Sequence, residues 1–284
     1  MGAVAANSLR SVETVPVRPA LDVIPPFPAV ALKALNVLSG TDTCLRELCE
    51  VIRPDAVFSA EILRLANSPL IAFSKEITNV LQASMLLGFR RLRRLVITVG
   101  LRSYLDQTST LLQSTWRHSV ACAMIAERMA RWNSVDREFA YTCGILHDVG
   151  RVVLATLDPE EYAALLNYRS ESTTKMLQLE RDTFEMDHCQ AGSWLVSAWQ
   201  LPEEFTAITA HHHEPLTRND DAAELIRLSC MLADGLAFPA ATNCSCPKLD
   251  EVMALVPDGI RAHLPPAEEW TAEISKELAL IEAS

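Results

Sequence analysis

The chain has 284 residues, 49% of them hydrophobic, and a formal net charge of −11. This length suits one large domain or two modest ones, and only 9 glycines and 6% aromatic residues exclude a β-sandwich or barrel. The acidic balance argues against nucleic acid and anionic membranes as partners, because phosphate binding depends on dense Lys and Arg.

The eight cysteines have no framework spacing. Cys244 and Cys246 lack the paired CxxC units of a zinc knuckle, and several of the others fall on apolar helical faces, where free cysteine behaves as a small hydrophobic residue. The first residues show no signal-peptide pattern, and no run of about 18 apolar residues predicts a membrane span. We therefore expect a cytoplasmic protein with reduced thiols.

The first part of the chain predicts a helical bundle after a loose start. Residues 1–21 mix small, polar and proline residues and predict a flexible lead-in. Residues 22–115 show short blocks of helical periodicity, which predict about five helices. The first block follows Pro25-Pro26-Phe27-Pro28, a run that favours a helix start, and a later block stops at Asn67-Ser68-Pro69. The last block has the spacing of one helix face: Leu92, Leu95, Val96 and Val99.

One basic cluster stands out near the end of this bundle. It consists of Arg90, Arg91, Arg93 and Arg94 and falls within an amphipathic stretch. Its position favours a solvated helix face. Binding of an anionic partner is the alternative.

The second part of the chain carries longer helical patterns. Residues 116–240 predict a helical core, and residues 241–284 predict a loop followed by an acidic helical tail. No stretch alternates in the manner of a strand, so the predicted fold class is all-α. The helices expected in the core cover about 116–132, 136–148, 159–169, 187–199, 203–213 and 221–238.

Six of the seven histidines lie between residues 118 and 213, and several stand on helix faces that should be apolar. His118, for example, shares its face with Cys122, Ile125 and Met129. Two aspartates also point toward the predicted core. The inward polar residues are His118, His147, Asp148, His188, His212 and Asp234.

A buried carboxylate without a partner costs several kcal/mol, so Asp148 and Asp234 need neutralising partners. No Lys lies on those faces, and Arg227 is the one cation near Asp234 along its helix. Imidazoles from several helices together with two carboxylates suit one or two divalent ions, Fe, Mn, Ni or Zn. The absence of cysteine partners argues against a structural zinc site. Two such ions a few Å apart bind a phosphate and generate the attacking hydroxide.

A simpler interpretation stays open beside the metal site. Each histidine can be a satisfied core residue, and His211-His212-His213 can be an exposed helix end, where histidine is favourable. The His147-Asp148 pair alone recurs by chance. The metal hypothesis rests on coincidence, because five separate helices each place a His or Asp on a face that should be apolar.

The blocks around these residues carry a family resemblance. His118 is followed by Leu146-His147-Asp148-Val149-Gly150-Arg151, which resembles the HD superfamily, named after that His-Asp doublet. Upstream, Ile62-Leu63-Arg64-Leu65-Ala66-Asn67-Ser68-Pro69 and Ala83-Ser84-Met85-Leu86-Leu87-Gly88 resemble one branch, the HDOD domain. Later blocks are similar to the same branch: Glu180, Asp187-His188 with Gly192, Trp199-Gln200-Leu201-Pro202-Glu203-Glu204, His212-His213-Glu214-Pro215 and Leu232-Ala233-Asp234.

The resemblance implies an all-helical HD-type core with an N-terminal helical bundle, in a bacterial signal-transduction protein. It places the metal ligands at His118, His147, Asp148, His188, His212, His213 and Asp234. HDOD proteins are similar to HD-GYP cyclic-di-GMP phosphodiesterases but generally have no assigned catalytic activity. In this chain no Gly-Tyr-Pro motif follows the paired histidines, and Arg151 replaces the family lysine. Both departures speak against cyclic-di-GMP hydrolysis.

Two functions therefore remain open. The first is a regulatory module that acts through protein partners in trans, with a pocket that holds a metal, a nucleotide or nothing. The second is a metal-dependent phosphohydrolase acting on a nucleotide or cyclic dinucleotide, with Asp148 binding metal and Arg151 holding phosphate as its catalytic residues. The missing Gly-Tyr-Pro motif favours the first.

Overall fold

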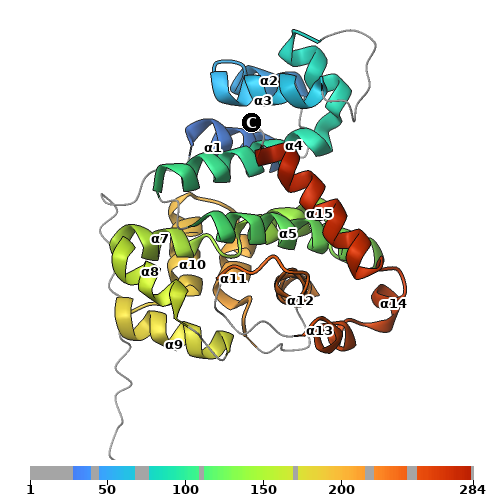
Figure 1. The fold of residues 1–284 in the computed structure, drawn as a ribbon. Helices are drawn as coiled ribbons and strands as arrows, with labels where there is room; N and C mark the ends of the chain where they lie inside the picture. The colour runs from blue at the N-terminus through green and yellow to red at the C-terminus, as the bar shows by residue number, and fades with distance from the viewer. Residues whose placement is uncertain are drawn as a thin grey trace, which may run out of the picture.

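The computed structural model describes residues 28–39, 45–67, 77–108, 112–168, 172–214, 221–241 and 248–282 (Figure 1). All regular structure in these ranges is helical, which confirms the all-α prediction. The helices are α1 (Ala29–Ser39), α2 (Leu45–Ile52), α3 (Ala56–Ala66), α4 (Val80–Thr108), α5 (Gln113–Met129), α6 (Arg137–Leu146), α7 (Gly150–Leu157), α8 (Pro159–Asn167), α9 (Thr173–Phe184), α10 (His188–Ala198), α11 (Glu203–His211), α12 (Asp221–Gly235), α13 (Leu249–Leu255), α14 (Asp258–Arg261) and α15 (Ala267–Glu282).

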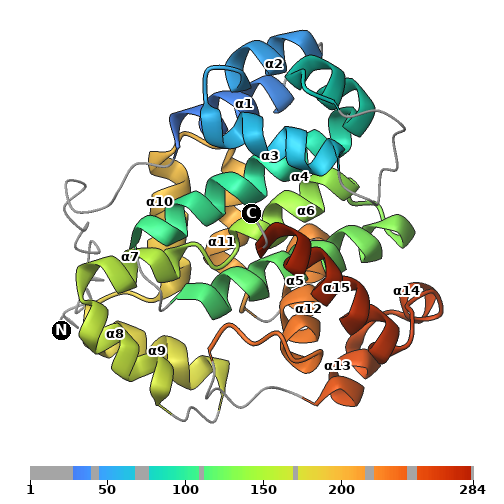
Figure 2. The same ribbon diagram turned by 45° about the horizontal axis from the view of Figure 1, so that its top comes forward.

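Helix α4 joins two groups of helices. It packs against α1, α2 and α3 and also contacts α5, α6 and α7. Figure 1 shows the blue helices α1 to α3 above α5 and the helices that follow it. Figures 1 and 2 both show α15 running alongside α5, which it contacts. The division of the chain at residues 115 and 116 stays a prediction.

Helix α4 bends at Gly88, where the backbone has φ 74° and ψ 162°. A Cβ built at this position meets nothing within 4 Å, so space is not the restriction. The positive φ is the restriction, because residues with a Cβ rarely adopt it. The bend separates a short first segment from the segment that carries the buried Leu92 and Val96.

The basic cluster of α4 meets an acidic partner inside the protein. Arg90 Nε lies 3.0 Å from Glu138 Oε1, and Arg94 forms an ion pair with Glu127. Arg137 Nη2 donates to the same Glu127 carboxylate at 2.5 Å. The prediction of a solvated face is therefore wrong for Arg94, whose side chain is 28% exposed, because acidic residues of α5 and α6 face it. These pairs tie α4 to the helices below it.

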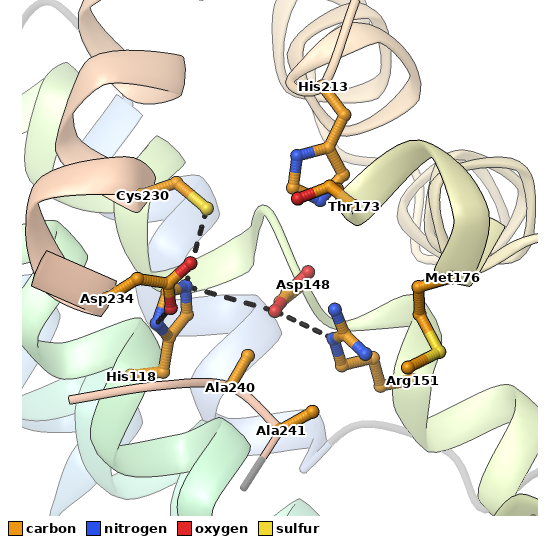
Figure 3. Close-up of a pocket in the computed structure, with 10 residues that line it drawn as sticks. All are labelled: His118, Asp148, Arg151, Thr173, Met176, His213, Cys230, Asp234, Ala240 and Ala241. Carbon is orange, nitrogen blue, oxygen red and sulfur yellow. Dashed lines mark hydrogen bonds and ion pairs between the residues drawn. The ribbon is translucent and has the colours of Figure 1, made fainter. Parts of the chain in front are cut away.

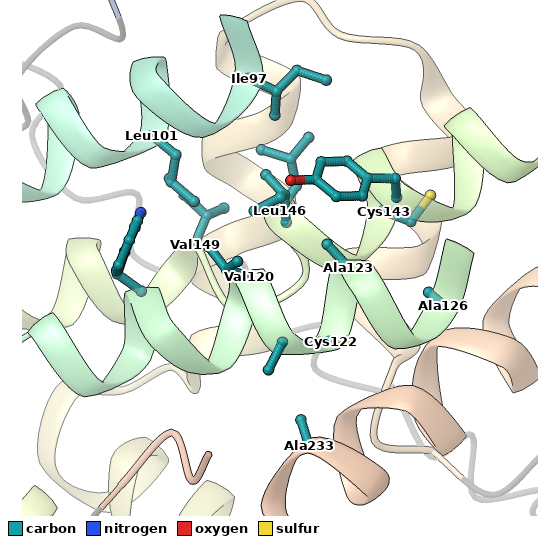
Figure 4. Close-up of a cluster of buried hydrophobic side chains, with 14 of the residues drawn as sticks. Ile97, Leu101, Val120, Cys122, Ala123, Ala126, Cys143, Leu146, Val149 and Ala233 are labelled. Carbon is teal, nitrogen blue, oxygen red and sulfur yellow. The ribbon is translucent and has the colours of Figure 1, made fainter. Parts of the chain in front are cut away.

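Two glycines permit the closest helix contacts in the core. A Cβ at Gly144 of α6 would lie 2.5 Å from the Cα of Ala123 in α5. A Cβ at Gly150 of α7 would lie 1.9 Å from the carbonyl oxygen of His188 in α10. The surrounding apolar core (Figure 4) includes Ile97, Leu101, Val120, Ala126, Leu146, Val149 and Ala233. Close packing of α7 on α10 brings the turn before α7 next to the start of α10.

The predicted helices of the core correspond to α5, α6, α8, α10, α11 and α12. Helices α7 and α9 were not predicted. Helix α9 is mostly polar and buries only Met176 and Glu180, so it has no apolar stripe to recognise. No helix in the described ranges is long and apolar enough to cross a membrane.

Some predictions fall outside the described residues. They are the lead-in 1–21, the run Pro25-Pro26-Phe27, the Ser68-Pro69 breaker, Pro215, the greater part of the loop after residue 241, and the cysteines Cys44, Cys244 and Cys246.

Candidate metal site

The predicted ligand residues come together in the helical core, at or near the ends of several helices. Figure 3 shows some of them around a small cavity. They are His118 in α5, His147 and Asp148 directly after α6, His188 at the start of α10, His212 and His213 directly after α11, and Asp234 in α12.

Most of these residues are shielded from solvent. His118, His147, His188 and His212 are completely buried, and Asp148 is 1% exposed. His213 and Asp234 are half-buried and lie at the edge of this group of side chains.

The exposed-helix-end interpretation holds for His211 alone in the run 211–213. The His211 side chain is 58% exposed and pairs with Glu214.

Each buried imidazole is oriented through its Nδ1 atom. Three Nδ1 atoms face backbone carbonyl oxygens, which only accept hydrogen bonds, so Nδ1 carries the proton and Nε2 presents its lone pair when the ring is neutral. The distances are 2.8 Å from His118 to Phe238, 2.7 Å from His147 to Gly144 and 2.9 Å from His212 to Thr209. Hydrogen bonds of this kind orient histidine ligands in metal sites.

His188 is oriented by a carboxylate instead. Glu180 Oε2 accepts hydrogen bonds from His188 Nδ1 at 2.6 Å and from the His188 backbone N–H at 3.0 Å. Glu180 is completely buried on α9, so this carboxylate is committed to the site. Its sequence block belongs to the family resemblance, but no role was predicted for it.

The Nε2 atoms face one another in pairs. His118 Nε2 lies 3.2 Å from His147 Nε2, and His188 Nε2 lies 3.2 Å from His213 Nε2. Two neutral imidazoles that both carry their proton on Nδ1 cannot form a hydrogen bond through Nε2. The His118–His147 pair therefore requires an added proton or a cation near the facing nitrogens.

Asp148 separates these two groups. Its Oδ1 lies 3.2 Å from His188 Nε2 and 3.5 Å from His212 Nε2. Its Oδ2 lies 4.0 Å from His118 Nε2 and 3.9 Å from His147 Nε2. We call His118 and His147, which face Oδ2, together with Cys230 next to His118, the His118 side. We call His188 and His212, which face Oδ1, together with His213 next to His188, the His188 side.

The His188 side contains two buried atoms without a hydrogen bond. Asp148 Oδ1 and His212 Nε2 have no hydrogen-bond partner among the described residues, although they face each other at 3.5 Å. A buried acceptor left unsatisfied is costly and calls for an explanation. A divalent cation accepts lone pairs from both atoms, so the residues present fit a metal ion.

Arg151 neutralises Asp148. Its Nε donates to Asp148 Oδ2 at 2.8 Å, and its Nη1 donates to Tyr162 Oη at 3.2 Å and lies 3.6 Å from Glu180 Oε1. Burial alone would raise the pKa of Asp148, but Arg151 and the neighbouring imidazoles hold that pKa well below its usual range. The guanidinium is itself buried and engaged, since Arg151 is only 5% exposed.

Asp234 lies behind His118 rather than among the Nε2 atoms. Its Oδ1 is 3.3 Å from His118 Nδ1, the nitrogen on the far side of the ring. Arg227, the cation predicted for it, contacts the Met231 sulfur at 3.6 Å. In this position Asp234 is a second partner of His118 Nδ1, beside the Phe238 carbonyl oxygen, and its side chain also lines the cavity.

Two cysteines reach the site, contrary to the prediction that cysteine partners are absent. Cys230 Sγ lies 3.5 Å from His118 Nε2, and Cys189 Sγ lies 3.9 Å from His212 Nδ1. Burial raises the pKa of Cys230 to about 12, so without a nearby cation it is a neutral thiol. The prediction is wrong because it looked for local CxxC pairs, whereas α12 brings Cys230 to a histidine 112 residues away.

The cavity among these side chains is small. Its volume is about 20 Å³, and its walls include Asp148, Arg151 and Asp234. This space holds one water molecule or one ion. Pockets for small organic ligands usually have about 300 to 1,000 Å³.

Comparison with known proteins identifies the family of this chain. The sequence profile of the HDOD domain matches residues 24–215. An uncharacterized protein from Treponema pallidum (strain Nichols) is 26% identical over 198 residues, which are 69% of this chain and 39% of that protein. The chain therefore spans well under two thirds of the length of this relative.

Solved structures share the fold. An HDOD domain protein of unknown function from Geobacter sulfurreducens has a TM-score of 0.68 at 23% identity, covering 92% of this chain and 91% of that one. A protein proposed to act in signal transduction, from Marinobacter aquaeolei VT8, has a TM-score of 0.69 at 19% identity, covering 92% and 58%. A protein proposed to be a phosphohydrolase, from Shewanella amazonensis SB2B, has a TM-score of 0.63 at 20% identity. The match covers 90% of this chain and 91% of that one.

Proposed function

The chain belongs to the HDOD domain family, and on that premise we propose that it is a regulatory signal-transduction module with a divalent metal in its HD pocket. It acts through protein partners in trans and not by hydrolysis. This proposal rests mainly on the hydrogen bond that Arg151 Nε donates to Asp148 Oδ2 at 2.8 Å.

The metal part of the proposal is supported by unpaired lone pairs. Asp148 Oδ1 and His212 Nε2 lack hydrogen bonds, and the Nε2 atoms of His118 and His147 face each other at 3.2 Å. Nitrogen and oxygen donors of this kind suit Fe, Mn, Ni or Zn. When bound, the metal supplies positive charge that links helices α5, α6, α10 and α11, because the donors follow or belong to these helices.

The non-catalytic part is supported by the position of Arg151. A two-metal hydrolase uses a shared carboxylate together with room for a phosphate and an attacking hydroxide. In this chain the guanidinium occupies one oxygen of Asp148, and the cavity has only about 20 Å³. The Gly-Tyr-Pro motif of the enzyme branch is absent from the sequence as well.

The second candidate is a metal-dependent phosphohydrolase acting on a nucleotide or cyclic dinucleotide. It is favoured by the histidines that face both oxygens of Asp148, an arrangement suited to two ions. In that case Asp148 binds metal, and Arg151 turns from the carboxylate to hold the phosphate. Arg151 cannot act as a proton donor at neutral pH.

Turnover and metal content of the untagged protein separate these functions. We expect the chain loaded with Mn²⁺, Fe²⁺ or Zn²⁺ to retain metal and to hydrolyse bis(p-nitrophenyl) phosphate and cyclic-di-GMP no faster than the matched variant Asp148→Ala. Hydrolysis that disappears in Asp148→Ala would establish the second candidate. A protein that retains none of these ions would contradict the metal part of the proposal.

A further inference from the structure

We infer that the His118 side of the pocket is a cysteine-containing metal site, in which His118, His147 and Cys230 together bind one thiophilic divalent cation such as Zn²⁺. This inference rests on the proposed function, since it assigns a ligand and a metal class to the same pocket. It replaces the expectation that the site offers only nitrogen and oxygen donors.

Two of the three distances among the donor atoms match those of a tetrahedral zinc site. Bond lengths of about 2.05 Å to nitrogen and about 2.3 Å to sulfur place two nitrogens about 3.3 Å apart and a nitrogen and a sulfur about 3.6 Å apart. The corresponding distances are 3.2 Å between His118 Nε2 and His147 Nε2 and 3.5 Å between His118 Nε2 and Cys230 Sγ. All three donor atoms lie within 4.8 Å of one another.

The thiol proton of Cys230 alone does not satisfy this group of atoms. The Nδ1 protons of His118 and His147 are committed to Phe238 and Gly144, so two Nε2 lone pairs point into the same space. Cys230 has one S–H to donate, and it lies close to His118. His147 Nε2 would then still face another lone pair, whereas a cation accepts from both nitrogens and from the sulfur.

Burial makes this arrangement selective. His118 and His147 are completely buried and Cys230 is 4% exposed, so bulk water does not compete freely for these atoms. On metal binding the S–H bond breaks, a sulfur–metal bond forms, and the proton leaves to solvent. Thiolate donors favour Zn²⁺ over hard ions such as Mg²⁺ and Mn²⁺. Figure 3 shows Cys230 and Asp234 next to His118. Cys230 contacts the Nε2 atom of that ring, and Asp234 contacts its Nδ1 atom.

The sulfur on the other side of Asp148 serves as a matched control. Cys189 is buried like Cys230, but its Sγ lies 3.9 Å from His212 Nδ1, the nitrogen that already donates to Thr209. Cys189 does lie within 4.8 Å of donor atoms of His188, His212 and His213. It approaches His212 at Nδ1 and not at Nε2, however, so we expect Cys230 and not Cys189 to form the sulfur–metal bond.

Cobalt spectroscopy tests the inference without an activity assay. The metal-free chain, with all 284 residues present, is expected to show a thiolate-to-cobalt charge-transfer band in the near ultraviolet when titrated with Co²⁺. The band should persist in Cys189→Ser and disappear in Cys230→Ser. Because removal of outer partners costs about 10–100-fold in affinity, loss of the direct ligand Cys230 should weaken Zn²⁺ binding by about 100-fold or more.

The outcomes separate this inference from the proposed function. Cobalt bound without the band, or a band that survives in Cys230→Ser, would overturn the cysteine ligand and leave a metal-binding module intact. Failure to bind any of Co²⁺, Zn²⁺, Mn²⁺ and Fe²⁺ would overturn both. If Cys230→Ser does not fold, X-ray absorption of the zinc-loaded natural chain decides, since a sulfur neighbour at about 2.3 Å is expected and its absence refutes the inference.

Discussion

On the His118 side of Asp148 both imidazoles are oriented by backbone carbonyl oxygens, whereas on the His188 side the first imidazole is oriented by the buried carboxylate of Glu180. On the His118 side a thiol lies next to an Nε2 atom, whereas on the His188 side the thiol of Cys189 lies next to an Nδ1 atom. The His188 side also has a third histidine. The same residue type thus meets two environments. The neighbours of the histidines, more than the number of histidines, therefore decide which cation each side prefers.

Removal of the shared carboxylate should disturb both sides at once. Asp148→Ala takes away the group between them and leaves Arg151 as a buried charge without its closest partner. Breaking a buried pair in this way costs about 3–5 kcal/mol. Urea unfolding and metal binding of the variant measure the two losses.

Asp148→Asn is the matched control, because it keeps the shape of the side chain but not its charge. It should lose metal binding with a smaller loss in the free energy of unfolding. Retention of metal on both sides in Asp148→Ala would contradict the central position assigned to this residue.

An added methyl group at Gly150 should affect the His188 side first. The new Cβ would lie 1.9 Å from the His188 carbonyl oxygen, so α7 and α10 must move apart. Overpacking of this kind costs about 1–3 kcal/mol or more. Thermal unfolding should show the loss for Gly150→Ala but not for Gly259→Ala, where an added Cβ meets nothing within 4 Å. Equal melting temperatures for the two variants would refute the close approach.

A substitution at Glu180 should weaken metal binding on the His188 side and leave the His118 side unchanged. Glu180→Gln removes the carboxylate that orients His188, and the loss of such a partner lowers metal affinity by about 10–100-fold. The thiolate band expected from the His118 side should remain. Glu127→Gln, a change at a buried carboxylate paired with Arg94 and Arg137, is the control and should leave metal affinity unchanged. A loss of the band in Glu180→Gln would show that the sides are not independent.

The smallest effect is expected at Asp234. Asp234→Asn removes the charge of a carboxylate that contacts His118 Nδ1, so Zn²⁺ affinity should fall by about tenfold, the lower end for outer partners. Calorimetric titration with Zn²⁺ compares it with Cys230→Ser. A larger loss for Asp234→Asn than for Cys230→Ser would make Asp234 the direct ligand.

The sequence patterns predict the helices that bury a regular apolar stripe. The face with Leu92 and Val96 is an example, since both residues are buried in α4. Helix α9 was not predicted, because it buries Met176 and Glu180 and little else. The partners of Arg94 were not predicted either, because Glu127 contacts Arg94 only when α4 packs across α5.

For the site, the sequence predicts which residues point inward but not which atoms meet. Histidines on apolar faces are recognisable from helical spacing, and the structure brings His118 and His147 to 3.2 Å. From its local pattern Cys230 is expected to be a small core residue, and Glu180 is expected to be a solvated acid. Their contacts with His118 and His188 depend on helices that are distant in the chain.

The most direct measurement is anomalous diffraction at the zinc edge from crystals of the full chain grown with Zn²⁺. The account predicts a peak within bonding distance of His118 Nε2, His147 Nε2 and the Cys230 sulfur, next to Asp148. A pocket without a peak, with the two facing nitrogens bridged by an ordered water molecule, would contradict it.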